Sequence, residues 1–91
     1  MKPWILQKTD IYRRHGGKRS RKRTVERLIY ACENIKQHDP KVKAPHMIGK
    51  KQVHEFYNRH SHLAPTTLRD YYYALAQLWQ WLGREGKPPK R

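Results

Sequence analysis

The chain has 91 residues, and its 21 lysines and arginines outnumber seven acidic residues, which gives a formal net charge of +14. No apolar run approaches the ~18 residues of a membrane-spanning helix, the N-terminus is too weakly apolar for a signal peptide, and a single cysteine cannot form an internal disulfide. Composition thus excludes a membrane protein and a disulfide-stapled module. It favours one small cytoplasmic domain with a polyanion as its first-choice partner.

The positive charge is concentrated at the start of the chain. Residues 1–23 hold nine basic residues and one acid, for +8, whereas residues 24–48 carry +1 and residues 49–91 carry +5. The densest run, Lys18-Arg19-Ser20-Arg21-Lys22-Arg23, is typical of a phosphate-binding arm, of a nuclear localisation signal, or simply of a solvated tail. Because the run leads into a predicted helix, we favour phosphate contact. Residues 1–19 show no clear period and are expected to form a basic N-terminal arm, with a short helix or turn before Gly16-Gly17 as the alternative for Trp4 to Arg14.

Helical spacing of apolar residues predicts a first firm helix from about Ser20 to Gln37. Ser20 is the expected N-cap, with Thr24 as the competing start, and Pro40 and Pro45 lie in the segment that ends the helix. Its apolar face consists of Val25, Leu28, Ile29, Cys32 and Ile35. The opposite face carries Arg23, Arg27, Tyr30 and Asn34.

A second, shorter helix is predicted from Gly49 to about His60. Val53, Phe56 and Tyr57 form its apolar stripe, and Lys50 and Lys51 lie at its start. Residues 61–64 are expected to form a turn.

The third helix, from Pro65 to about Glu85, has the clearest pattern. Pro65 suits the first helical position, and Gly86 followed by Pro88-Pro89 is expected to end the helix. Its apolar stripe is Leu68, Tyr71, Tyr72, Leu75, Leu78, Trp79 and Leu82. No segment alternates like a strand. We therefore expect an all-α, three- to four-helix bundle over residues 20–86, with residues 87–91 as a linker or tail.

Candidate catalytic and metal-binding residues are few. The closest histidines, His60 and His62, have a spacing that does not place two ligands on one helix face, and no cysteine or carboxylate partner is evident. Tyr71 and Tyr72 fall on the apolar stripe, and Cys32 is expected to be a small buried apolar residue, so we expect all three to pack in the core. We therefore expect no enzyme activity from this chain alone, and no metal, cofactor or small-molecule substrate.

The polar faces of the helices fit DNA better. Arg69, Tyr73, Gln77 and Gln80 share one face of the third helix, and such side chains pair with phosphates and with base edges in the major groove. The competing interpretation is an ordinary solvated face, which every amphipathic helix has.

The third helix also resembles a family pattern. Residues 64–86 look like the last helix of the core-binding domain of tyrosine recombinases, the phage integrases, on the strength of Thr66, Thr67, Ala74, Leu78, Trp79, Trp81-Leu82 and Gly86. Residues 48–57 and 23–35 resemble the two preceding helices of that domain. The family's N-terminal helix is not evident, and its catalytic domain is absent from the chain.

The resemblance implies a SAM-like DNA-binding domain that forms one half of a clamp on double-stranded DNA, associated with the nucleoid and in contact with other recombinase protomers. Its two long helices would approach the major groove. The residues expected to contact DNA, from the charge pattern and the resemblance together, are Lys18, Arg19, Arg21, Lys22, Arg23, Arg27, Lys50, Lys51, Thr66, Thr67, Arg69, Tyr73, Gln77 and Gln80.

Two other functions are compatible with the sequence. One is a small basic RNA-binding or ribosome-associated protein, although no aromatic strand platform for single-stranded RNA is evident. The other is a protein–protein adaptor in which outward-facing Trp81 and Tyr73 anchor a partner helix.

Overall fold

The chain folds into four α-helices and one short 3₁₀ turn in the computed structural model, which describes residues 2–14 and 18–90, with the side chains of residues 2–8 and 22–90. The elements in chain order are α1 (Lys2–Arg14), α2 (Lys18–His38), η1 (Pro45–Met47), α3 (Lys50–Arg59) and α4 (Pro65–Trp81). These described ranges contain no strand. The prediction of a small all-α bundle is therefore confirmed.

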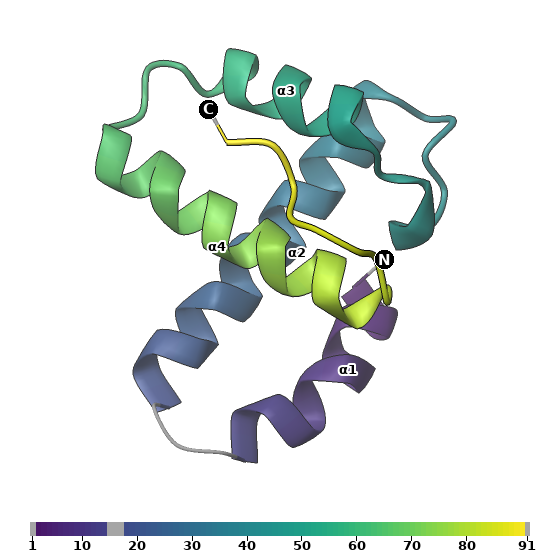
Figure 1. Cartoon of the computed structure of the whole chain (residues 1–91), viewed down its shortest axis with the longest axis vertical. Helices are drawn as coiled ribbons and strands as arrows, with labels where there is room; N and C mark the ends of the chain where they lie inside the picture. The colour runs from purple at the N-terminus through teal and green to yellow at the C-terminus, as the bar shows by residue number, and fades with distance from the viewer. Residues whose placement is uncertain (1, 15–17, 91) are drawn as a thin grey trace.

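Helix α2 is the central element of the bundle. It contacts α1, α3 and α4, and Figure 1 shows α4 crossing in front of it, α3 lying across the top and α1 running beside its lower half. As its spacing predicts, α2 buries Val25, Leu28, Cys32 and Ile35. They meet the apolar faces of the other helices in one core, which includes Ile5, Val53, Phe56, Leu68, Leu75, Leu78 and Trp79.

Helix α1 lies where the sequence suggested an arm. Ile5 is fully buried and Trp4 packs against the same core, so this part of the chain belongs to the bundle. Pro3 is compatible with a helix here because it sits in the first turn, where a backbone N–H has no intrahelical partner. The run from Lys18 is likewise helical, so α2 begins at Lys18 and the expected N-cap at Ser20 is wrong.

Helix α4 ends four residues earlier than predicted, at Trp81. Gly83 adopts φ +70°; its N–H donates to the Gln80 carbonyl at 3.0 Å, and the Arg84 N–H donates to the Trp79 carbonyl at 3.1 Å. This pair of bonds is a Schellman motif, in which a glycine in the left-handed region closes a helix. Gly83 therefore performs the role that the sequence assigned to Gly86, and Gly86, at φ +75°, turns the chain a second time.

The segment after α4, residues 82–90, is called the tail below. It folds back across the bundle instead of leaving it, as Figure 1 shows. Pro88 is buried, and the Tyr57 hydroxyl donates to the Pro89 carbonyl at 3.1 Å. Residues 87–90 therefore pack on the domain and are not a free linker; Arg91 lies outside the described residues.

Candidate nucleic-acid interface

A groove runs along the outer face of α4, between this helix and the tail. It consists of two adjoining hollows of about 490 and 350 Å³ that share Tyr73 and Lys87. The larger hollow is also lined by Pro65, Leu68, Arg69, Tyr72 and Lys90, and the smaller one by Ala76, Gln77, Gln80, Arg84 and Gly86. We call the two together the α4–tail groove.

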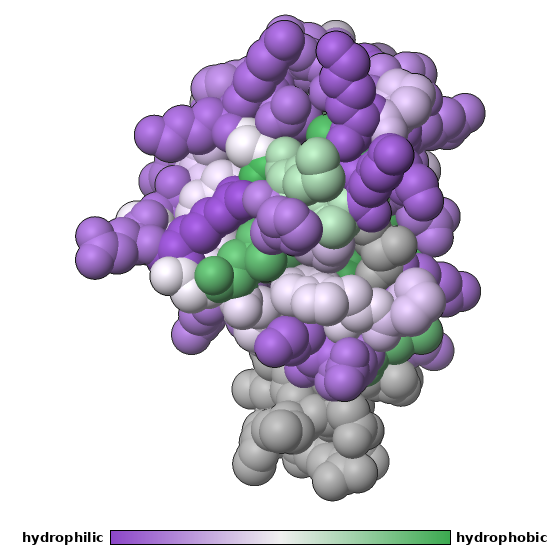
Figure 2. Space-filling model, turned by 90° about the vertical axis from the view of Figure 1, so that its right-hand side faces the viewer, coloured by the Kyte–Doolittle hydropathy of each residue, from purple (hydrophilic) through white to green (hydrophobic). Residues whose placement is uncertain are grey.

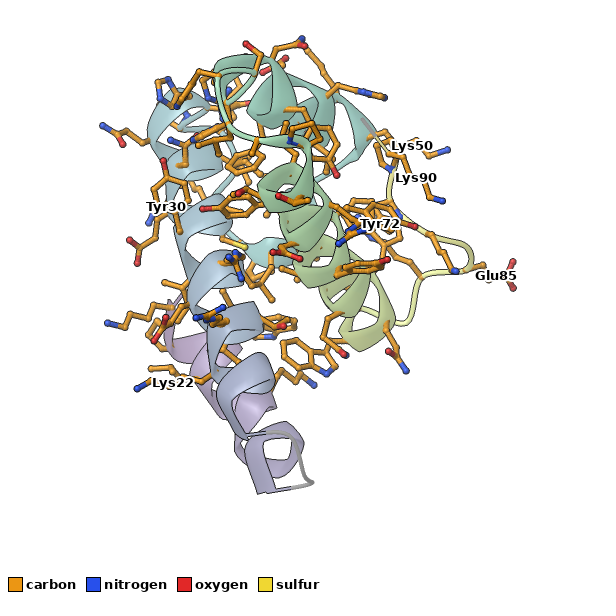
Figure 3. All side chains as sticks on the ribbon, turned by 90° about the vertical axis from the view of Figure 1, so that its left-hand side faces the viewer. Lys22, Tyr30, Lys50, Tyr72, Glu85 and Lys90 are labelled. Carbon is orange, nitrogen blue, oxygen red and sulfur yellow. The ribbon has the colours of Figure 1, made fainter. Side chains whose placement is uncertain are left out.

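The α4–tail groove is cationic. Arg69, Lys87 and Lys90 are exposed along it, and none of its lining residues is acidic. Glu85, the acidic residue of the tail, is exposed and points away from α4 in Figure 3. The Lys90 ammonium lies 5.5 Å from the centroid of the Tyr72 ring, a cation–π contact that holds the end of the tail over α4. The groove therefore offers positive charge together with aromatic surface.

Four of the predicted DNA-contacting residues line this groove. Arg69 and Gln80 are exposed, Tyr73 is 57% exposed, and Gln77 is half-buried and donates from its amide to the Gln80 side-chain oxygen at 3.3 Å. The prediction that they share one face of the helix is confirmed. Thr66 and Thr67 lie in the first turn of α4 and do not line the groove.

The predicted residues of α2 lie elsewhere. Lys22 and Arg23 are exposed near the start of the helix, whereas Arg27 is half-buried and its guanidinium lies 3.6 Å from the Asp70 carboxylate of α4. Arg27 therefore ties two helices together, and part of its charge is already compensated. Lys18, Arg19 and Arg21 are on the helix, but their side chains lie outside the described ones.

Lys50 and Lys51 begin α3, and both are exposed; the Lys51 ammonium is 3.9 Å from the Glu55 carboxylate. Figure 3 shows Lys50, with Tyr72 and Lys90, on the opposite side of the molecule from Lys22. The predicted phosphate-binding residues therefore do not form one surface. They divide between a side that includes the α4–tail groove and a side that includes the first half of α2.

The outer face of α2 beyond Arg27 is used for packing. The Tyr30 hydroxyl lies 2.8 Å from His60 Nε2, and His60 Nδ1 lies 2.8 Å from the Phe56 carbonyl. Because that carbonyl can only accept, Nδ1 carries a proton and donates to it, while Nε2 shares its hydrogen bond with the Tyr30 hydroxyl. Arg59 donates two hydrogen bonds, at 3.0 and 2.8 Å, to the side-chain oxygen of Asn34. These contacts join α3 to α2.

Candidate nucleophiles are held in their protonated forms. Burial raises the pKa of the Cys32 thiol to about 12 and that of the Tyr57 hydroxyl to about 12. Burial, with a smaller contribution from Tyr30, also raises the pKa of Tyr71. A thiol or phenol of this kind is a weak nucleophile at neutral pH.

Within the described ranges, no three histidine, cysteine or acidic side chains gather in a group that could hold a metal ion.

Sequence reasoning missed the contribution of the tail. The sequence predicts a linker or tail for residues 87–91, without a role in the site, yet Lys87 and Lys90 both line the groove. Arg84 anchors the tail: its guanidinium donates to the carbonyls of Ile48, at 2.6 Å, and His46, at 2.7 Å, and lies 4.4 Å from the Trp79 ring centroid. The two glycines that follow α4, so close together, were the available signal that the chain reverses here.

The side of the molecule that displays α1 and the end of α4 is mainly hydrophilic, with apolar residues in several small, separate areas (Figure 2). None of the helices in the part of the chain that the structure describes has the length and apolar character needed to cross a bilayer.

A scan against protein-family models, a search of curated proteins and a search of solved structures find no match to the chain. The family resemblance therefore rests on the residues of the helices alone.

Proposed function

We propose that this chain binds double-stranded DNA, with the α4–tail groove as its principal contact surface. The observation that carries the proposal is the placement of Arg69, Lys87 and Lys90 along one groove that no carboxylate lines, beside the polar face of α4. Phosphate neutralisation by such cations supplies most of the affinity in protein–DNA complexes. Tyr73, Gln77 and Gln80 offer hydrogen bonds at the same surface, where sequence preference would arise.

The side of the bundle that carries Lys22 and Arg23 has a lesser role in this proposal. Because Lys22 is on the side away from Lys50 and Lys90 in Figure 3, one straight duplex on the groove would not reach both surfaces. Their charge would act at longer range, by attracting DNA before contact, an effect that salt screens.

The finer part of the proposal is that the chain acts as the core-binding domain of a tyrosine recombinase, associated with the nucleoid. Its support is the resemblance of α2, α3 and α4 to the helices of that domain and the DNA-compatible face of α4. Selection from a pool of random duplexes tests it: a recombinase domain should enrich a defined core site, whereas enrichment of no sequence would refute this part and leave general DNA binding intact.

The test of DNA binding is a fluorescence-anisotropy titration of labelled duplex with the full chain between about 50 and 200 mM salt. Each of Arg69→Gln, Lys87→Gln and Lys90→Gln should reduce the slope of log affinity against log salt by about 0.9, the value for one lost phosphate contact. Lys36→Gln, which removes the same charge from the exposed last turn of α2, is the matched control and should change the slope less.

Two results would overturn the assignment. If the groove variants and Lys36→Gln behave alike, the contact surface is not the α4–tail groove. If structured RNA displaces the duplex at equimolar concentration, the RNA-binding alternative replaces DNA binding.

A further inference from the structure

The larger hollow of the α4–tail groove has the dimensions of a small-molecule site. Its volume of about 490 Å³ lies within the range of pockets that enclose a small ligand and is far too small to enclose a duplex. A duplex on this face would therefore cover the hollow without filling it. An occupant of the hollow itself has to be a unit of about nucleotide size.

The chemistry of the lining residues restricts which ligands of that size would bind. Pro65 and Leu68 supply apolar lining, and Tyr73, which lines the same hollow, is exposed to solvent. The Tyr72 ring carries the Lys90 ammonium, and the centroids of the two tyrosine rings are 5.6 Å apart at an interplanar angle of 59°. Tyr73 is therefore the aromatic surface on which a planar group can stack.

Three cations line the same hollow as this ring. Arg69 approaches from α4, and Lys87 and Lys90 approach from the tail, with no acidic residue among the lining. A flat aromatic group joined to an anion fits this combination, and a nucleotide is such a group: its base stacks on an aromatic side chain while its phosphate meets the cations. Paired bases inside a duplex cannot offer their faces in this way, because neighbouring pairs cover them.

We propose that the larger hollow binds an unpaired nucleotide of DNA, with its base on Tyr73 and its phosphate among Arg69, Lys87 and Lys90. The proposal rests on the function proposed above, since it takes the same groove as the DNA-contacting surface. It adds that the chain prefers DNA with an extrahelical or single-stranded base, such as a bulge, a gap or a frayed end, over an intact duplex.

The experiment compares two duplexes of the same sequence, one intact and one with a single bulged 2-aminopurine, each titrated with the full chain. We expect tighter binding of the bulged duplex and quenching of the 2-aminopurine fluorescence as its base stacks. From the range for base–aromatic stacking, Tyr73→Ala should weaken binding of the bulged duplex by roughly 5- to 150-fold and so abolish its preference over the intact duplex, to which Tyr73 offers only its hydroxyl.

Tyr73→Phe is the matched control and should retain both the preference and the quenching, since it keeps the ring and removes only the hydroxyl. Tyr73 is exposed, so neither substitution should unfold the bundle, which circular dichroism verifies. Equal affinities of the wild-type chain for the two duplexes, or a preference that persists in Tyr73→Ala, would overturn this inference while leaving duplex binding in place. Failure to bind either duplex would overturn both proposals.

Discussion

Arg84 provides the clearest test of how the groove is built. Its guanidinium joins the start of the tail to two backbone carbonyls around η1, those of Ile48 and His46, and it stacks on Trp79 of α4. Because these partners come from segments 36 and 38 residues away in the chain, the side chain fixes long-range geometry. We predict that Arg84→Ala destabilises the bundle and loosens the tail.

The size of the effect follows from those contacts. A hydrogen bond to a charged group contributes about 1.5–3 kcal/mol, and a cation–π contact about 0.5–1 kcal/mol. The bond to the His46 carbonyl is exposed to solvent, and water can replace much of it. We therefore expect a loss of about 2–3 kcal/mol in the free energy of unfolding, which corresponds to a fall in Tm of roughly 10–20 °C for a domain of this size.

Urea unfolding followed by circular dichroism measures this loss, with Arg23→Ala as the control because Arg23 is exposed on α2. Arg84→Lys should fall between the wild type and Arg84→Ala, since an ammonium can reach one carbonyl but lacks the planar fork. If the free energy of unfolding of Arg84→Ala lies within about 0.5 kcal/mol of the values for the wild type and for Arg23→Ala, the Arg84 contacts do not hold the tail.

Three further predictions concern the backbone, the core and the end of the tail. Gly83→Ala should lower the free energy of unfolding by about 1–2 kcal/mol, because a backbone at φ +70° strains an L-residue even though no atom lies near the added Cβ. An unchanged midpoint in a urea titration would contradict the Schellman motif at Gly83. The folded chain holds the Cys32 proton to higher pH than the unfolded chain, so the free energy of unfolding should fall as pH rises from about 9 toward 12, by up to about 1.4 kcal/mol per pH unit. Urea titrations across this range should show a shallower fall for Cys32→Ala, and equal slopes would argue against a buried thiol. Tyr57→Phe removes the donor to the Pro89 carbonyl and should cost about 1 kcal/mol and lower the NMR order parameters of residues 87–90; unchanged order parameters would show that this bond does not restrain the tail.

The helices that the sequence predicted well are those with a wide apolar stripe. In α3 and α4, residues such as Val53, Phe56, Leu68 and Leu75 recur at helical spacing and all are buried, so local pattern and tertiary packing agree. Helix α1 lacks this signal: its consecutive apolar residues Trp4-Ile5-Leu6 show no period, and Leu6 is exposed while Ile5 is buried. Its contribution to the core depends on packing against α2, which the pattern of residues within α1 does not reveal.

The candidate site also has a part that the sequence predicts and a part that it does not. The shared face of Arg69, Tyr73, Gln77 and Gln80 follows from helical geometry and could be predicted from spacing alone. The contribution of the tail could not, because it depends on contacts between segments more than 30 residues apart, such as Tyr57 with Pro89. Charge counts alone pointed to the first 23 residues, whereas the groove takes its cations from α4 and from the end of the chain.

The charge of the groove is a product of the fold. Helix α4 by itself is neutral, since Arg69 is balanced by Asp70. In the folded chain the Asp70 carboxylate pairs with Arg27 of α2, whereas Arg69 lines the groove on the outer face. Two reversals of the chain, at Gly83 and Gly86, then bring Lys87 and Lys90 back along that face. Asp70→Asn should therefore leave the salt dependence of DNA binding almost unchanged, although it removes the only acid of α4. A marked rise in affinity for duplex DNA would instead mean that the DNA lies against the Arg27–Asp70 side of the helix.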